Sequence, residues 1–177
     1  MFKSTQDMLD KISKYYPKPV TLNDVYVFPV ILADNDLDRE NEQFSDKALY
    51  QLADLLIGKI GFVGKTTARI FDTEVVDSEE PINKLVLDYK YIKAWCWIRK
   101  NFKNKDLIEV LENTISDRGS VSCAVTERIC SCCGKNKAKY KCNCEHSFTI
   151  LSEVTDVYEW SFEPLLYRID DEQLKET

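Results

Sequence analysis

Residues 130–146 read CSCCGKNKAKYKCNCEH, a stretch that contains five of the seven cysteines and the only histidine of the 177-residue chain. A Cys-x-x-Cys pair followed by glycine holds two thiolates about one turn apart, and a second arm can then return two further ligands to complete a tetrahedron. Cys130 and Cys133 are the predicted ligands of the first arm. The second arm is predicted to supply Cys144 and His146, because a Cys-x-His pair places both side chains on one side of an extended strand. The pattern therefore predicts a zinc knuckle.

Two alternatives accompany this ligand set. Cys142 is a reserve ligand, since Cys142-x-x-x-His146 would bring both side chains to one face of a helical turn. A pair of disulfides would need an oxidising compartment, whereas the chain begins Met1-Phe-Lys3 without an apolar signal segment, so we expect reduced thiols. Thiolate-rich sites usually fill all four coordination positions, and catalytic zinc keeps one open. The predicted Zn²⁺ is therefore structural.

The zinc knuckle also carries a run of alternating lysines. Nucleic-acid binding is the competing function that such a run suggests, but the chain has a net charge of −6 and so lacks a general electrostatic footprint for nucleic acid. A solvated lysine loop is the simpler interpretation. The lysines concerned are Lys135, Lys137, Lys139 and Lys141.

Composition predicts one domain over residues 1–177. The 44% hydrophobic and 11% aromatic content suffices for one well-filled core, expected over about residues 20–165, and 5 Gly and 5 Pro leave no linker tract. No apolar run approaches the roughly 20 residues of a membrane span, so no membrane partner is expected. Residues 1–17 should hold an N-terminal helix, and residues 168–177 a polar tail.

Periodicity and turn residues predict an α+β fold with two to three helices. Val25–Leu32 is a β-branched and aromatic strand in which Pro29 indicates an edge or a bulge. Ser45 should cap a helix that Gly58 ends. The elements follow one another without a regular βαβ rhythm, so we expect a small closed or nearly closed sheet with the knuckle inserted. Further strands are predicted at 67–76, 89–98, 120–125, 150–151 and 154–162, and a further helix at 106–115.

Two other features are predicted to be structural. Gly64-Lys-Thr66 resembles the end of a phosphate-binding loop, but that motif requires a second glycine where Lys59 stands, and a strand rather than a helix should follow. The three tryptophans, Trp95, Trp97 and Trp160, are expected in the core rather than in an aromatic binding patch.

Seven sequence blocks over residues 24–163, in this order, resemble prohead maturation proteases encoded in the head-gene clusters of tailed phages and prophages of low-GC Gram-positive bacteria. This resemblance implies an assemblin-like β-barrel serine protease fold, whose task in the family is to cut scaffold and capsid segments inside the immature head. The blocks are 34–44 (DNDLDRENEQF), 58–62 (GKIGF), 68–76 (ARIFDTEVV), 91–95 (YIKAW), 120–125 (SVSCAV), the cysteine knuckle and 154–162 (VTDVYEWSF).

The chain departs from this family where the chemistry requires a base. Ser120 matches the family's nucleophilic serine, but the histidine expected just after Gly58–Phe62 is missing, and zinc is predicted to take His146. A serine without a base is a poor nucleophile. We therefore expect a phage head protein with a degenerate protease fold, and Ser120 as a vestigial nucleophile.

Two other functions remain open on the sequence. One is an active maturation protease that uses Ser120 with a lysine, a carboxylate or a His146 released from the metal; the other is a zinc-stabilised module unconnected with virions. The expected partners are the major capsid protein or other head proteins, with a homo-oligomer left open. The expected location is the virion head, or the host cytoplasm during assembly.

Overall fold

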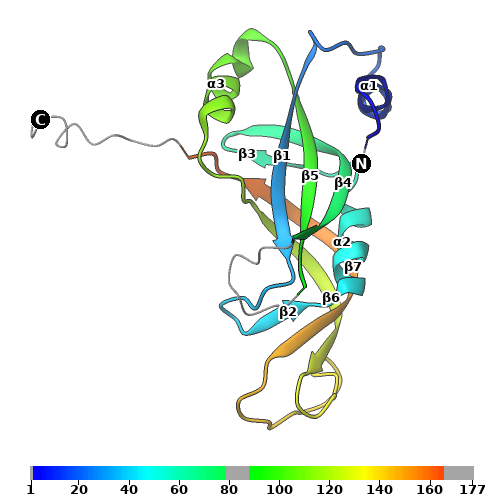
Figure 1. Ribbon diagram of the computed structural model, residues 1–177, viewed down its shortest axis with the longest axis vertical. Coiled ribbons are helices and arrows are strands. Elements are labelled where there is room, and N and C mark those ends of the chain that lie inside the picture. Colours follow the sequence, from blue (N-terminus) through cyan, green and yellow to red (C-terminus); the bar gives the residue numbers. More distant parts are fainter. Residues whose placement is uncertain (1, 79–87, 166–177) are drawn as a thin grey trace, which may run out of the picture.

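The computed structural model describes residues 2–78 and 88–165, so the predicted polar tail at 168–177 lies outside the described residues. The described chain is mixed α+β, as predicted, with the helices set around a strongly curved sheet (Figure 1). The helices are α1 (Thr5–Ser13), α2 (Asp46–Leu56), the 3₁₀ helix η1 (Phe102–Asn104) and α3 (Lys105–Asn113). The strands are β1 (Val25–Asp34), β2 (Glu42–Phe44), β3 (Ile60–Val63), β4 (Thr66–Ser78), β5 (Tyr89–Arg99), β6 (Ser120–Cys130) and β7 (Thr149–Phe162).

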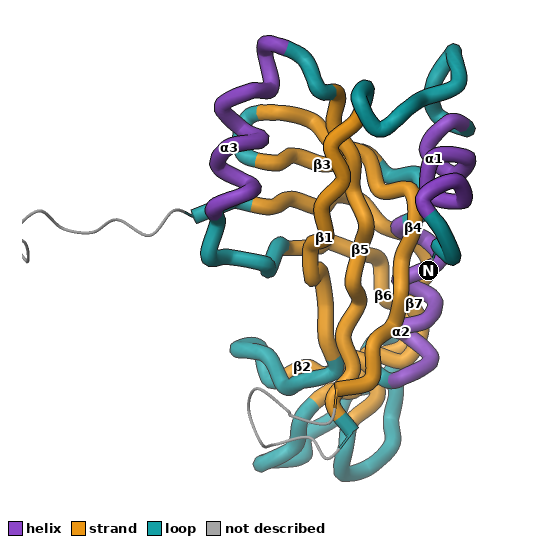
Figure 2. The backbone as a smooth tube through the Cα atoms, turned by 45° about the horizontal axis from the view of Figure 1, so that its top comes forward, coloured by secondary structure: helices purple, strands orange, loops and turns teal. Residues whose placement is uncertain are grey.

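The strands form one sheet of two parts. Its order is β1-β5-β4-β3-β7-β2, and β6 pairs with β7. The β1-β5-β4 part is antiparallel, as is the long β6–β7 pair, whereas β7 runs parallel to its other neighbours, β2 and β3. The short strand β3 therefore joins the two antiparallel parts, which diverge along the molecule (Figure 2).

The sheet is not closed, so the predicted β-barrel is wrong. Among the described residues, β1 meets the segment just before β6 at one isolated bridge, between Ile31 and Arg118. There the Ile31 N–H donates to the Asp117 carbonyl (2.7 Å) and the Gly119 N–H donates to the Ile31 carbonyl (2.8 Å). Two residues before Ile31, on the same edge, Pro29 has no N–H to donate. The register of β1 also shifts between Ile31 and Ala33. This edge of β1 cannot carry a continuous ladder, as the proline had indicated.

Helix α2 covers the inner side of the sheet and builds the main core. Its side chains Leu49, Leu52 and Leu56 are fully buried. The Ser45 hydroxyl accepts a hydrogen bond from the Ala48 N–H (3.1 Å) and so caps the helix. Gly58 follows the helix with a φ of +85°, a conformation that glycine adopts without strain. Both ends of α2 thus lie where the sequence predicts them.

A second apolar cluster lies between helix α1 and the outer side of the sheet. Met8, Leu9 and Ile12 pack there with Trp97, and Trp95 packs against the same cluster. Strand β5 can serve two clusters because successive side chains point to opposite faces, so its even-numbered apolar residues enter the main core. Trp160 is buried in the main core, which confirms the core assignment of the tryptophans.

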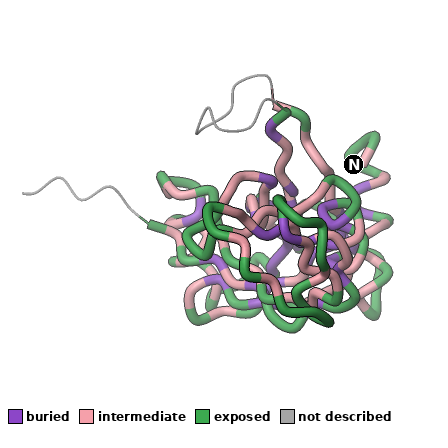
Figure 3. The backbone as a smooth tube through the Cα atoms, turned by 90° about the horizontal axis from the view of Figure 1, so that it is seen from below, coloured by how far each residue is buried: buried purple, intermediate pink, exposed green. Residues whose placement is uncertain are grey.

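Figure 3 shows the buried residues gathered inside the molecule and the exposed ones mainly in the peripheral loops. Gly64 and Lys65 form the two-residue turn between β3 and β4, with a φ of +58° at Gly64, so the sequence there is a hairpin turn and no phosphate-binding loop. Among the described helices, none has the length and apolar character needed to span a bilayer.

Candidate metal centre

The candidate metal centre lies at the far end of the β6–β7 pair, in a loop that we call the cysteine loop (residues 131–148). The two strands are paired up to Cys130 and Thr149, so the loop begins and ends at adjacent positions. In Figure 1 the loop forms the lower end of the molecule, away from α1 and α3. The loop therefore projects from the body of the protein, which reaches it at Ser147, where the Asn41 amide donates to the Ser147 carbonyl (2.9 Å).

The backbone after Cys130 folds into the turn that a knuckle requires. The Gly134 N–H donates to the Cys130 carbonyl (3.0 Å), and the Cys130 N–H donates to the Lys135 carbonyl (2.9 Å). Gly134 has a φ of +73°, which explains why glycine follows the second cysteine of the pair. The Cys132 N–H points to the Cys130 sulfur at 3.4 Å. The turn thus directs Cys130 and Cys133 to the same side.

Four cysteine sulfurs meet at this turn, all within 4.8 Å of one another, and they belong to Cys130, Cys133, Cys142 and Cys144. The Cys133 and Cys142 sulfurs are 3.6 Å apart. Two thiolates of a tetrahedral zinc site, each about 2.3 Å from the ion, lie roughly 3.8 Å apart, so the spacing suits zinc. All seven cysteines are free, so the disulfide alternative is not what the structure contains.

The structure differs from the predicted ligand set at one position. Cys142 completes the group of four, and His146 is not a member of it. His146 is exposed, and its backbone has a φ of +57°. Cys142-Asn-Cys144 is itself a Cys-x-Cys arm, in which alternate side chains face the same way, so both sulfurs can face the first knuckle. The Cys-x-Cys spacing could have been recognised in the sequence. The predicted preference for His146 over Cys142 is corrected.

The environment of the sulfurs favours a cation. Hydrogen bonds from the backbone N–H groups of Cys133 and Cys132 lower the pKa of Cys130 to about 5, so its thiolate is stabilised. The pKa of Cys144 is raised, because hydrogen bonds with the sulfurs of Cys142 and Cys133 keep it protonated. Several thiols this close cannot all ionise alone, whereas a divalent cation displaces their protons. The site therefore fits a metal such as Zn²⁺.

Contacts outside the four cysteines hold the base of the cysteine loop and also its middle, where the Lys137 N–H donates to the Arg128 carbonyl (2.7 Å). The Ser131 N–H donates to the Phe148 carbonyl, and the Phe148 N–H donates to the Ser131 hydroxyl, both at 2.9 Å. The Lys137 ammonium donates to the Thr149 hydroxyl (2.8 Å). The other three lysines of the loop are exposed, as predicted for a solvated face. No loop residue belongs to either apolar cluster, so a bound metal would supply most of the energy that orders the tip.

Ser120 lies at the opposite end of β6. Its side chain is exposed beside a shallow hollow of about 210 Å³, which is also lined by Ser122, Glu159 and Ser161. None of the hydrogen bonds found among residues 2–78 and 88–165 joins its hydroxyl to a lysine, a carboxylate or an imidazole. His146 follows the other end of β6, and ten residue steps along a strand span about 33 Å. His146 therefore cannot serve Ser120 as a base.

The chain was compared with protein-family models, with curated proteins and with solved structures, and none of them matches.

Proposed function

We propose that the four clustered cysteines hold one structural Zn²⁺ ion. Cys130, Cys133, Cys142 and Cys144 offer four sulfurs within 4.8 Å of one another, which is a complete tetrahedral set with no open position for a substrate or a reactive water. When bound, the ion would cross-link the two ends of the cysteine loop. Its role is to fold the loop that projects from the β6–β7 pair.

We further propose that the protein is a component of a phage head that keeps a protease-like chain but does not cut peptides. The resemblance of seven ordered sequence blocks supports the phage context. The observation that carries the loss of catalysis is the position of Ser120, which is exposed at the start of β6 while the only histidine lies beyond the strand's other end. The partners in this proposal are the major capsid protein or other head proteins.

Purified particles test the head assignment. Mass spectrometry should find the full-length chain in a fixed ratio to the capsid protein, because a structural subunit stays in the particle whereas a maturation protease usually leaves or digests itself. Particles without the chain would overturn the proposal. Particles that contain it only as fragments would favour the protease.

Chemical labelling tests the loss of catalysis. We expect fluorophosphonate probes to leave Ser120 unlabelled, and Ser120→Ala to leave the length of the capsid protein unchanged, because an unassisted hydroxyl supplies almost no alkoxide at neutral pH. Stoichiometric labelling, or uncleaved capsid precursor with the alanine variant, would contradict this expectation.

An active protease remains the second candidate, and the hollow beside Ser120 favours it. Glu159 lines the same hollow as Ser120. Among the described residues that line this hollow, it is the one with a carboxylate. If Ser120 is labelled, Glu159→Gln should abolish the labelling, and Asp156→Gln, on the same strand outside the hollow, should not. Labelling that survives Glu159→Gln would exclude this carboxylate as the base.

A further inference from the structure

Two short segments concentrate positive charge on an otherwise acidic protein. Residues 65–69 (KTTAR) and 99–105 (RKNFKNK) contain six lysines and arginines and no acidic residue, whereas the chain as a whole has a net charge of −6. The first segment begins at the β3–β4 turn, and the second runs from the end of β5 through η1. Strands β4 and β5 are paired, so the fold brings the two segments together.

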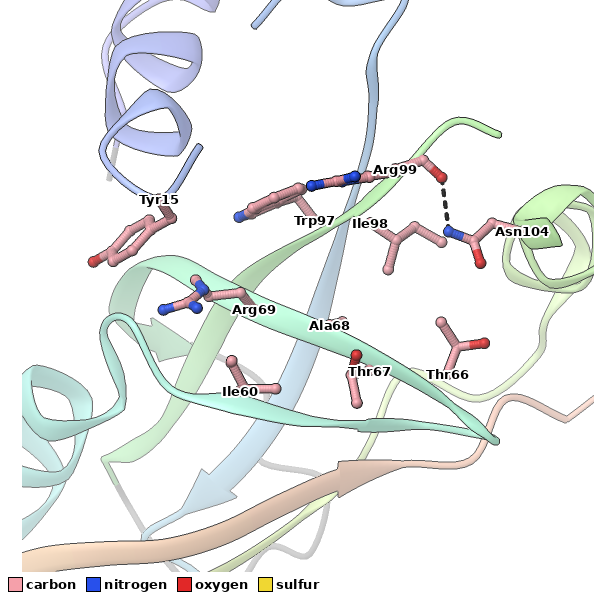
Figure 4. Close-up of a pocket in the computed structure, with 10 residues that line it drawn as sticks. All are labelled: Tyr15, Ile60, Thr66, Thr67, Ala68, Arg69, Trp97, Ile98, Arg99 and Asn104. Carbon is pink, nitrogen blue, oxygen red and sulfur yellow. Dashed lines mark hydrogen bonds between the residues drawn. The ribbon is translucent and has the colours of Figure 1, made fainter. Parts of the chain in front are cut away.

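Residues 66–69 of the first segment and Arg99 and Asn104 of the second help to line a groove of about 380 Å³ on the outer side of the sheet (Figure 4). Arg69 and Thr67 come from β4, and Arg99 from β5. Asn104 closes the side toward η1, where its amide donates to the Arg99 carbonyl (2.9 Å). Tyr15, after α1, stands at the other end. The volume falls in the range of ligand sites in proteins.

Both arginines of the groove are held in place by aromatic rings. The Arg69 guanidinium lies 4.8 Å from the centre of the Tyr15 ring, and it also donates to the Gly58 carbonyl (3.1 Å). The Arg99 guanidinium lies 4.8 Å from the centre of the Tyr16 ring. Stacking fixes the planar group and leaves N–H donors free at its edge. The two side chains are therefore preorganised to bind an oxyanion.

Neither groove arginine forms an ion pair with a carboxylate in the described ranges 2–78 and 88–165. Arg118 and Arg128, by contrast, pair with Asp34 and Glu42. A guanidinium presents a fork of N–H groups that matches a carboxylate, and charge-assisted bonds of this kind are the strong ones. Arg69 and Arg99 therefore hold binding capacity that the rest of the described chain does not use.

An apolar hollow is lined by residues that neighbour Arg99 and Asn104 of the groove along the chain. It measures about 420 Å³ and is lined by Lys100, Asn101, Phe102, Lys105 and Ile108. Phe102 is 92% exposed, which is unusual for a large aromatic side chain in a folded domain. On the groove side, Ile60 is 55% exposed. The surface thus combines exposed apolar side chains with cations, and we call the groove and this hollow together the basic groove.

We propose that the basic groove docks a peptide segment of a partner protein that carries acidic side chains next to apolar ones. Arg69 and Arg99 would bind carboxylates, and Phe102 with Ile108 would receive an apolar side chain. Single-stranded nucleic acid fits less well, because an arginine already covers one face of the Tyr15 ring and of the Tyr16 ring, which leaves less aromatic surface for bases to stack on.

This inference goes beyond the proposed function and does not depend on it, because it uses neither the cysteines nor Ser120. It can therefore fail while the zinc and head assignments stand, or hold while they fail.

Fluorescence anisotropy of the full chain tests it with a short labelled peptide of aspartate, glutamate and leucine. Saturable binding is expected. Arg69→Gln and Arg99→Gln should each weaken it about tenfold or more, as expected for a lost charge-assisted hydrogen bond, and Phe102→Ala should weaken it as well. Arg39→Gln is the matched control, because Arg39 is exposed elsewhere on the chain, and it should leave binding unchanged.

The same assay shows whether the groove binds side-chain carboxylates or the carboxylate at the C-terminus of the peptide. A peptide with asparagine and glutamine in place of the acids tests the side chains, and it is used with a free and with an amidated C-terminus to test the chain end. Because Arg69 contacts Tyr15 and Gly58, Arg69→Lys serves as a second variant that keeps the charge without the fork. No binding of the acidic peptide, equal weakening by Arg39→Gln, or tighter binding of oligothymidylate that depends on Arg69 and Arg99 would each overturn the proposal.

Discussion

Replacing Cys142 by serine should weaken metal binding by the cysteine loop, enough for a competing chelator to remove the ion, without unfolding the protein. Structural zinc in small four-ligand sites is worth about 10–16 kcal/mol. One ligand in four corresponds to an equal share of about 3 kcal/mol, which is roughly a hundredfold loss in affinity. The structure predicts this loss for Cys142 because its sulfur lies 3.6 Å from that of Cys133, inside the group of four.

Two neighbours provide matched controls within the same loop. Cys132→Ser makes the same chemical change at an exposed cysteine outside the group, and His146→Asn removes the ligand that the sequence alone had favoured. Both variants should keep one zinc per chain in native mass spectrometry and should resist a competing chelator as the unmodified protein does.

Hydrogen exchange then shows which backbone amides lose protection when the metal is lost. Without the ion, the two arms that carry the cysteines lose their cross-link, so amides in residues 131–134 and 139–146 should lose protection in the Cys142→Ser protein. The Lys137 amide should keep more of its protection, because its N–H donates to the Arg128 carbonyl (2.7 Å). The main core and its melting temperature should change little, since neither apolar cluster includes a loop residue.

Two results would refute this reasoning. Retained zinc in Cys142→Ser together with lost zinc in His146→Asn would restore the ligand set that includes the histidine. Absence of zinc from the unmodified protein, with the loop equally protected, would remove the metal site altogether.

The packing of the body gives three further predictions. Gly61→Ala should destabilise the fold by more than about 1 kcal/mol, because the new Cβ would lie 2.3 Å from the Trp160 ring and 2.4 Å from its carbonyl oxygen; an unchanged denaturant midpoint would contradict this. Leu52→Ala, at a fully buried position, should cost about 2–5 kcal/mol in the same assay, against about 0.5 kcal/mol or less for the half-exposed Leu22→Ala. Burial raises the pKa of Tyr89 to about 12, above the value near 10 of an unfolded tyrosine, so its contribution is complete below pH 10 and is lost as the pH rises toward 12. Denaturation at several pH values should show a smaller loss over this range in Tyr89→Phe, and equal losses would refute the assignment.

The sequence by itself determined most elements of this protein, because each of these is fixed by neighbours along the chain. It did not indicate the short strands β2 and β3. The Ser45 cap and Gly58 set the ends of α2, and Pro29 marked an edge strand. Cys130-x-x-Cys133-Gly located the metal turn, since a turn of this kind is closed by bonds between residues four or five apart. Local patterns of this kind need no knowledge of distant partners.

Only the tertiary structure decided how these elements meet. The choice of Cys142 over His146 depends on which side of the returning arm faces the first knuckle, and a shift of one residue reverses the side that a strand presents. The basic groove joins Arg69 and Arg99, thirty positions apart, through the pairing of β4 with β5. Closure of the sheet failed at a single edge of β1. Each of these outcomes is set by contacts between residues far apart in the chain, whose geometry local propensity does not encode.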